Sequence, residues 1–262
     1  MQTYGVTDWP VPEREELRAF CRETLGRDDV FEVDVRVGRP EDEIHAVAQT
    51  LGADLLVMGS QGLTGIPKML LGSTAERVLR ESNVPVLVTA SDVHAPRTAA
   101  DVPALVRRII IAVDLSEASG ALVRLGALVG QSFDVPVLLM HSIEPLGASP
   151  RARGYLPSLQ RTVRDEAEAS LLEFAAGSAG TIEPIVFVGD PAETIVSAAE
   201  TRGAGLIIMG LNQSGARRVG AVAYRVLSRT HVPILALPAS AATRLARELA
   251  HSNGSGAELQ TK

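Results

Sequence analysis

The stretch of sequence that decides the fold is Asp54-Leu-Leu-Val-Met-Gly59-Ser-Gln-Gly62, followed by Gly72-Ser73-Thr-Ala-Glu-Arg-Val-Leu79 and Asn83-Val-Pro-Val-Leu-Val88. Residues 54 to 58 form a short apolar run bounded by turn residues, which is typical of a parallel strand buried on both faces. Gly59 and Gly62 end that strand. Ser73 lies where a helix should begin, and the Asn83–Pro85 segment breaks that helix before a second apolar run. The stretch predicts strand, glycine loop, helix and strand in that order.

A loop of this kind is a candidate ligand site. In open parallel sheets a ligand lies beyond the carboxyl ends of the strands, and backbone N–H groups at the start of a helix attract phosphate there. Glycines allow such N–H groups to approach phosphate oxygens closely, and the Ser73 hydroxyl adds a donor. The alternative is that the glycines only form the turn and Ser73 only caps the helix.

The chain contains an internal repeat, which organises everything else. Four blocks recur in the same order, so the two halves are copies of one α/β unit. The matched blocks are 37–44 with 188–195, 52–59 with 203–210, 77–79 with 225–227, and 83–87 with 231–235.

The second copy is the complete one. Apolar, β-branched runs predict strands at 109–113, 135–140, 182–188, 206–209 and 233–237. Helices are expected between them, at about 116–130, around 159–174, and at 191–202 and 221–229. Pro184 lies inside the third strand, and proline in a strand is tolerated mainly at a sheet edge. This alternation predicts a doubly wound parallel sheet with strand order 3-2-1-4-5.

The first copy is shortened at its front. Phe31 to Val37 alternate apolar and polar residues, which predicts its third strand, but Leu17 on the preceding helix lies only 16 residues after Met1. No room remains for strands one and two. Three explanations stay open: a start placed too late or a truncated chain, a reduced half whose strands three and four pair directly, or strands supplied by a partner.

The predicted organisation is therefore a shortened first domain (1–90), a second domain (107–240) and a tail (241–262). Residues 90–106 are expected to form a linker. The start of the tail, 241–250, is expected to form a short exposed helix.

Composition excludes several classes of function. The net charge of −6 opposes a general electrostatic hold on nucleic acid, and 3% aromatic residues offer little stacking surface for single strands. No apolar segment reaches the length of a membrane span, and Met1 to Trp9 lack the pattern of a signal peptide. We therefore expect a cytoplasmic protein without nucleic-acid or membrane partners.

The repeat and the loop together resemble the universal stress protein family in its tandem form. The resemblance covers about residues 11 to 240 and rests on Gly59-x-x-Gly62, nine residues and then Gly72-Ser73, with Val57-Met-Gly before the loop and Ala75-Glu-Arg-Val-Leu79 after it. It implies two tandem open parallel five-stranded sheets of the adenine-nucleotide α-hydrolase-like type, the first copy lacking its strands one and two.

The resemblance also implies ATP, with or without Mg²⁺, as the ligand. The loop and the helix start would hold the phosphates, and an acidic residue closing strand one would hold the adenosine end. Lys68 could add charge at the phosphates. The residues that fall in these roles are Met58, Gly59, Gln61, Gly62, Gly72, Ser73 and, in the second copy, Asp114.

Each half retains what the other lacks. The first copy has the phosphate loop but no acidic strand end, whereas the second copy has Asp114 but a shorter loop in which Ala221 matches Ser73. We therefore expect the second copy to be degenerate, although Arg217 and Arg218 could still attract a phosphate. No catalytic set and no metal site emerge, since the five histidines are scattered and there is one cysteine.

The leading hypothesis is a regulatory protein of the stress response that binds an adenine nucleotide through the first copy. A nucleotide-independent interaction module is the alternative, because the resemblance implies pairing of the last strands, 85–88 and 233–236, either within the chain or in a homodimer. A slow ATPase is the second alternative.

Overall fold

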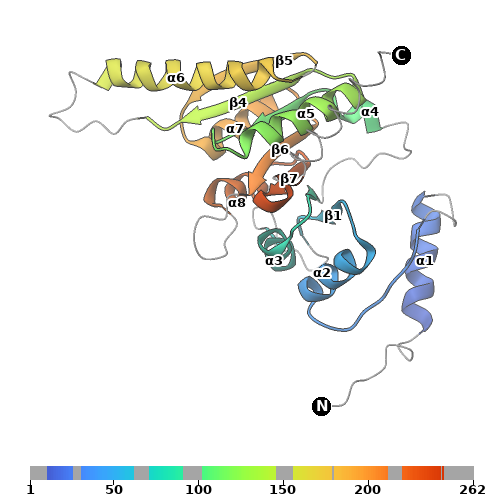
Figure 1. Ribbon diagram of the computed structural model, residues 1–262. Helices are drawn as coiled ribbons and strands as arrows, with labels where there is room; N and C mark the ends of the chain where they lie inside the picture. The colour runs from blue at the N-terminus through green and yellow to red at the C-terminus, as the bar shows by residue number, and fades with distance from the viewer. Residues whose placement is uncertain are drawn as a thin grey trace, which may run out of the picture. The chain divides into compact units, whose positions relative to one another are not determined.

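The computed structural model describes residues 11–25, 31–61, 71–90, 102–145, 156–178, 180–211, 220–242 and 244 (Figure 1). These residues fall into two compact units, Met1–Leu51 and Gly52–Lys262. The boundary differs from the repeat boundary, because the last strands of the first copy belong to the same unit as the whole second copy.

The first unit consists of α1 (Val11–Leu25) and α2 (Pro40–Leu51) with an extended segment between them. Pro40 begins α2, where its fixed backbone angle and missing N–H are tolerated. The strand predicted at Phe31–Val37 is wrong: these residues have no regular secondary structure and pair with no strand that the structure describes. Alternating apolar residues become a strand only when a neighbouring strand accepts their hydrogen bonds, and no described strand lies beside these residues.

The second unit contains all the described strands. Its first-copy part is β1 (Leu56–Gly59), α3 (Ser73–Glu81) and β2 (Val86–Thr89). The rest is α4 (Val102–Leu105), β3 (Ile109–Ala112), α5 (Ser119–Phe133), β4 (Val137–Ile143), α6 (Leu156–Ala176), β5 (Ile182–Val188), α7 (Pro191–Thr201), β6 (Leu206–Leu211), α8 (Ala221–Leu227) and β7 (Ile234–Pro238).

These strands form one seven-stranded sheet in the order β1-β2-β7-β6-β3-β4-β5. The second copy supplies five neighbouring strands, all parallel, and the first copy supplies two. The copies are joined by the antiparallel pairing of their last strands, with Val86 opposite Ala236 and Val88 opposite Ile234. A pairing of the last strands within the chain, which the resemblance implied, is therefore present, and the two expected sheets are joined into one.

Both faces of the second copy's sheet are covered. Helices α5 and α6 contact each other and the sheet, and α7 and α8 likewise contact each other and the sheet. Ile109, Ile110 and Ile111 are all fully buried although their side chains point alternately to opposite faces. Such double burial explains why the strands are continuous apolar runs.

Two segments between and after the domains hold structure that the sequence analysis did not expect. The expected linker contains α4, a single turn of helix whose last residue, Leu105, packs against Gly205. The tail begins as a helix, as expected, since residues 239–242 are helical, but Ala241 and Ala242 are buried and not exposed. Small apolar side chains of this kind pack readily at the end of a sheet, and composition alone did not indicate it.

Candidate functional site

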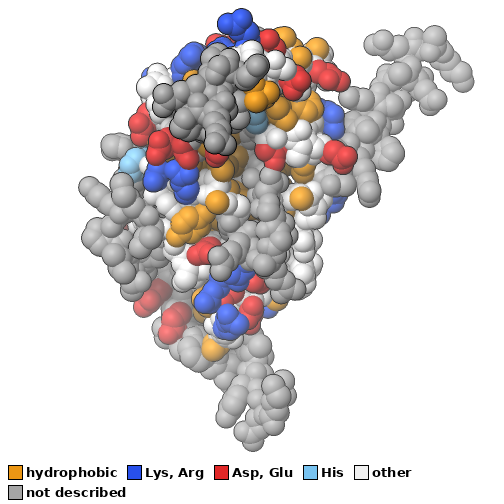
Figure 2. All heavy atoms as spheres, turned by 90° about the vertical axis from the view of Figure 1, so that its left-hand side faces the viewer, with side chains coloured by type: hydrophobic (Ala, Val, Ile, Leu, Met, Phe, Trp, Pro, Cys, Tyr) orange, Lys and Arg blue, Asp and Glu red, His pale blue; other side chains and the backbone are white. Residues whose placement is uncertain are grey.

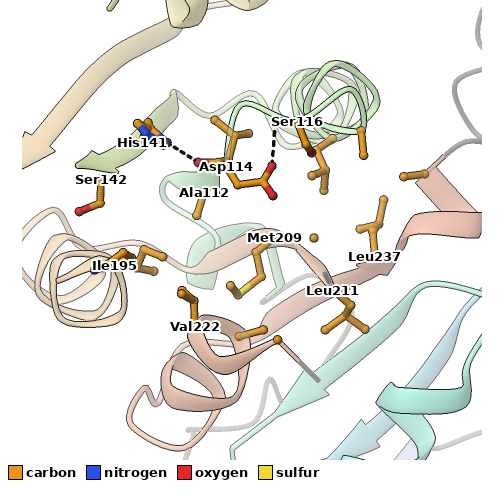
Figure 3. Close-up of a pocket in the computed structure, with 18 of the residues that line it drawn as sticks. Ala112, Asp114, Ser116, His141, Ser142, Ile195, Met209, Leu211, Val222 and Leu237 are labelled. Carbon is orange, nitrogen blue, oxygen red and sulfur yellow. Dashed lines mark hydrogen bonds between the residues drawn. The ribbon is translucent and has the colours of Figure 1, made fainter. Parts of the chain in front are cut away.

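A cavity of about 290 Å³ lies at the carboxyl ends of β3, β4 and β6 (Figure 3). This is the edge at which ligands bind in doubly wound parallel sheets. Its walls come from the turn after β3, from the starts of α7 and α8, and from the end of β7 with the residues that follow it. All of these elements belong to the second copy.

Asp114 lies in the turn after β3, on one wall of the cavity. Its Oδ1 accepts a hydrogen bond from the Ser116 N–H at 3.0 Å and another from the Ser119 hydroxyl at 3.2 Å. The next residue, Leu115, has a left-handed backbone with φ of 61°. A bulky residue in that region costs about 1–2 kcal/mol, and such strain concentrates at functional sites.

His141 adds a fixed imidazole to the same wall. Its Nδ1 lies 2.9 Å from the Val113 carbonyl oxygen, which only accepts hydrogen bonds, so the proton of the neutral ring is on Nδ1. Nε2 is then an acceptor. Ser142 follows on β4; its hydroxyl donates to the Gly189 carbonyl oxygen and accepts from Thr194.

The floor of the cavity is apolar. Figure 3 shows Met209 and Leu211 across the cavity from Asp114 and Ser116. Other apolar lining residues are Leu122, Met140, Ile195, Val222 and Leu237. Among the described lining residues none is Lys or Arg. Such a cavity suits a flat apolar ring with a few hydrogen-bonding groups better than a bare polyanion.

An ion pair lies beside the cavity wall, at the start of α7. Asp190 caps α7 by accepting from the Glu193 N–H, and its Oδ2 lies 2.6 Å from Nη1 of Arg225 on α8. The hydrogen bond from Arg225 is the main reason that the pKa of Asp190 is lowered, with the Glu193 N–H as the second. This pair connects the two helices that flank the cavity.

The predicted residues of the first copy lie at the end of β1. Met58 and Gly59 close the strand, and Ser73 begins α3 as expected. Gly72 is the N-cap of α3, and its own N–H donates to the Ser60 carbonyl oxygen at 2.8 Å. Among the described residues no side chain caps this helix. Gln61 is the last described residue before the loop, whereas Gly62 and Lys68 lie outside the described residues.

The structure does not bring Asp114 together with the described ends of the glycine loop, Gly59 and Ser73. Because β2 is antiparallel to β7, the two groups of strands run in opposite directions. The carboxyl ends of β1 and β2 therefore lie where the amino ends of β3, β6 and β7 lie. Asp114 therefore lies at one end of the strands, and Gly59 and Ser73 lie at the opposite end. The described part of the structure therefore contains no pocket that combines Asp114 with Gly59 and Ser73.

Several cavity residues escaped the sequence analysis. Gly220, Ala239 and Ala242 line the cavity although none was singled out. The repeat gave a signal for Gly220, since it precedes the residue that matches Ser73. Arg217 and Arg218, which were predicted to attract a phosphate, lie outside the described residues.

Two further features limit the kinds of site. No group of three metal-ligating side chains occurs among the described residues, and no described helix is both long and apolar enough to cross a bilayer. On the face shown in Figure 2, basic side chains are interspersed with acidic ones. The described side chains on that face form no continuous basic patch for a phosphate backbone.

The fold and the cavity define a doubly wound α/β protein with a ligand-sized pocket at the carboxyl edge of its sheet. The model of the universal stress protein family matches residues 4–90 and 106–238. The chain therefore belongs to the universal stress protein family, with two family segments in tandem.

Individual relatives match more locally. The universal stress protein MJ0577 of Methanocaldococcus jannaschii is 48% identical over 52 residues, which is 20% of this chain and 32% of that protein. Universal stress protein G of Escherichia coli O157:H7 is 48% identical over 54 residues, 21% of this chain and 37% of that protein. The matched stretches thus span about a third of these curated relatives.

Solved structures show the fold over most of the chain. A universal stress protein from Archaeoglobus fulgidus has a TM-score of 0.61 and 20% identity, covering 87% of this chain and 79% of its own. A functionally unknown protein, PA1789, from Pseudomonas aeruginosa has a TM-score of 0.63 and 16% identity, covering 91% and 82%.

Proposed function

We propose that the chain is a regulatory protein that binds an adenine nucleotide, with the adenosine end in the cavity beside Asp114. The observation that carries this proposal is the cavity itself: about 290 Å³ of mostly apolar space with one carboxylate on its wall. A purine ring would lie against Met209 and Leu237, and the Asp114 carboxylate would accept hydrogen bonds from the ligand.

A ligand bound in the cavity would affect the helices around it. Pro191 and Ile195 of α7 and Val222 of α8 line it, so a ligand would contact both helices at once. A ligand that binds one arrangement of these helices better than another shifts the population toward that arrangement. Regulation of contacts with other proteins in the cytoplasm, rather than turnover, is the function that this supports.

The phosphates need cations that the described lining does not contain. Arg217 and Arg218 are the candidates within the second copy, and Mg²⁺ could accompany ATP. Affinity for adenosine should therefore depend on Asp114, and the additional affinity for ATP should depend on the two arginines and fall with salt.

A second candidate site is the phosphate loop of the first copy, with Met58, Gly59, Gln61, Gly62, Gly72 and Ser73. The uncapped start of α3, a nine-residue helix, supports it. Because the Gly72 N–H is engaged by Ser60, the N–H groups of the next residues, from Ser73 onward, would have to contact the phosphate.

Isothermal titration of the full chain with ATP and with adenosine tests the main proposal. Asp114→Asn keeps an oxygen for Ser116 and Ser119 but removes the charge. A hydrogen bond to a charged group contributes about 1.5–3 kcal/mol, so we expect about a tenfold or greater loss of affinity for both ligands. Glu117→Gln, an exposed change in the same turn that does not line the cavity, should have no effect.

Gly62→Glu distinguishes the two sites. If this variant loses ATP while Asp114→Asn keeps it, the nucleotide binds at the first copy and the cavity proposal is wrong. If neither the parent chain nor any variant releases heat with either ligand, adenine-nucleotide binding is wrong for both sites. An assembly and a thermal stability that ATP leaves unchanged would then favour the nucleotide-independent interaction module.

A further inference from the structure

The residues that follow β7 form one wall of the cavity beside Asp114. Residues 239–242 are helical and come directly after Pro238, the last residue of β7. Ala239 and Ala242 line the cavity. The match to the family model ends at residue 238. The cavity therefore takes one wall, which we call the tail turn (residues 239–242), from outside the two matched segments.

The tail turn has little to hold it in shape by itself. The helical residues that the structure describes after β7 are 239–242 and 244, far fewer than the roughly 12 residues that an isolated helix needs to be stable in water. Its conformation therefore depends on contact with the rest of the fold. Ala241 is fully buried and Ala242 is 2% exposed, whereas Ala239 and Ser240 are exposed. The buried side chains of the turn are thus two methyl groups, which remove little apolar surface from water.

The helices on other sides of the cavity are anchored by larger buried groups. Ile195 of α7, which lines the cavity, is buried, and so are Val226 and Leu227 of α8. The ion pair between Asp190 and Arg225 connects the two helices. Displacement of either helix would expose large apolar side chains to water and separate this pair.

The strands and α5 form walls that are also firmly held. Strands β3, β4 and β6 each pair with a strand on both sides. Helix α5, which contributes Leu122 to the cavity, has buried residues along much of its length. Local opening occurs where buried apolar contacts are few, and the lids of ligand sites are drawn from such regions. By this measure the tail turn is the described wall that opens at the lowest cost.

We propose that the tail turn is the movable wall of the cavity, through which a ligand enters and which the bound ligand holds closed. A ligand in the cavity contacts Ala239 and Ala242 only while the turn is docked. It therefore binds the docked arrangement better and shifts the population toward it. By linkage, docking of the turn raises the affinity for the ligand by the same factor. An adenine nucleotide as that ligand rests on the proposed function, but the movement of the turn does not.

Labelling of single cysteines with N-ethylmaleimide in the full chain, followed by mass spectrometry, tests the proposal. Cys21, the one cysteine of the chain, is first removed by Cys21→Ser. Ala242→Cys places a thiol on the tail turn, and Ala223→Cys is the matched control on α8. Both alanines line the same cavity and are nearly equally buried, with 2% and 3% exposure. Ser240→Cys, at an exposed position, gives the rate of an unprotected thiol.

The rates without ligand show whether the wall moves. The Ala242→Cys thiol should react more slowly than the Ser240→Cys thiol, because the docked turn buries it. It should react at least about tenfold faster than the Ala223→Cys thiol, because the turn opens more readily than α8. Circular dichroism melting shows which variants fold. Should Ala242→Cys or Ala241→Cys not fold, the other replaces it with the same expectation.

The rates with adenosine show whether a ligand closes the wall. Ala241 is fully buried on the tail turn but does not line the cavity, so adenosine cannot shield the Ala241→Cys thiol directly. At about ten times its dissociation constant, adenosine should slow the labelling of this thiol about tenfold, because it stabilises the docked turn by mass action. The Ser240→Cys thiol should react at the same rate with and without adenosine.

Three results would overturn the proposal. Equal rates for Ala242→Cys and Ala223→Cys would mean that the turn is held as firmly as α8, and equal rates for Ala242→Cys and Ser240→Cys would mean that no docked wall exists. The third is adenosine that releases heat on titration but leaves the Ala241→Cys rate unchanged. A chain that gives no heat with adenosine contradicts the proposed function instead, and the rates without ligand then decide whether the wall moves.

Discussion

At the scale of single residues, Asp190 shows how one carboxylate can serve two elements. It caps α7 and pairs with Arg225 of α8, and both contacts favour its charged form. Its pKa is therefore lower in the folded chain than in the unfolded chain, where it is about 3.9. The stabilisation is present above that value and is lost as pH falls through the lowered pKa of the folded state.

Asp190→Asn should therefore reduce stability at pH 7 and flatten the acid limb of the stability curve. Asparagine still caps a helix, so the cap remains and the loss isolates the contribution of the charge. Urea unfolding at several pH values between about 2.5 and 7 measures it. A variant whose stability falls as steeply as that of the parent below pH 4 would show that Asp190 does not carry this dependence.

Also at this scale, the sequence predicted the position of Asp114 at the end of a strand but not the backbone conformation of Leu115. The acidic residue at the end of an apolar run was expected from the resemblance. The left-handed backbone of Leu115 was not expected, because glycine and asparagine are the residues that indicate a left-handed conformation and leucine is not. The burial of Ala241 and Ala242 escaped for a similar reason, since alanine occurs readily both inside and outside.

At the scale of elements, Gly205 sets how closely α4 approaches β6. A Cβ added at Gly205 would lie 2.1 Å from the Leu105 carbonyl oxygen and 2.6 Å from the Val106 Cα, and backbone atoms cannot rotate away. Gly205→Ala should cost about 1–3 kcal/mol of unfolding free energy or more. Asp54→Ala, at the matching place in the first copy, should change it by less than about 0.5 kcal/mol.

Denaturant melts of the two variants provide the measurement. Equal midpoints for Gly205→Ala and the parent chain would mean that α4 moves away from β6 without cost. A loss for Asp54→Ala as large as that for Gly205→Ala would mean that the two positions of the repeat are more alike than the structure shows.

At this scale, the strands and helices also show which elements the hydrophobic pattern predicts and which it does not. Ile182–Val188 was predicted to the residue, and the other strands of the second copy to within a few residues, because buried parallel strands are unbroken apolar runs. Phe31–Val37 had an equally good alternating pattern and formed no strand. The pattern specifies which face is apolar, but a strand also needs a partner. Helix α4 was missed because four residues carry too little periodicity.

At the scale of the whole molecule, the decisive feature is the direction of two strands. Both candidate half-sites were proposed from the sequence, but nothing in the sequence said that Asp114 and Gly59 lie at opposite ends of the strands of one sheet. That follows from the antiparallel β2–β7 pair, a contact between segments about 150 residues apart. Placement of the candidate residues therefore required the topology, whereas the choice of residue types rested on the sequence alone.

The distribution of buried side chains across the chain leads to a last prediction. Apolar burial is confined to the second unit: every buried apolar side chain among the described residues lies beyond Leu51, from Leu71 onward. In the first unit α1 has no buried residue in the described part, and α2 has only Glu41. Helices without a buried apolar face gain little from packing and open at low cost.

Hydrogen exchange followed by mass spectrometry should therefore separate the two units. Amides of α1 and α2 should exchange at least about 100-fold faster than those of β3, a difference of about 2.8 kcal/mol in opening free energy. Peptides from α3 and β2 serve as the control: they belong to the same copy but share the large sheet, so they should exchange slowly. Fast exchange of α3 and β2 together with α1 and α2 would show that stability follows the repeat boundary and not the sheet.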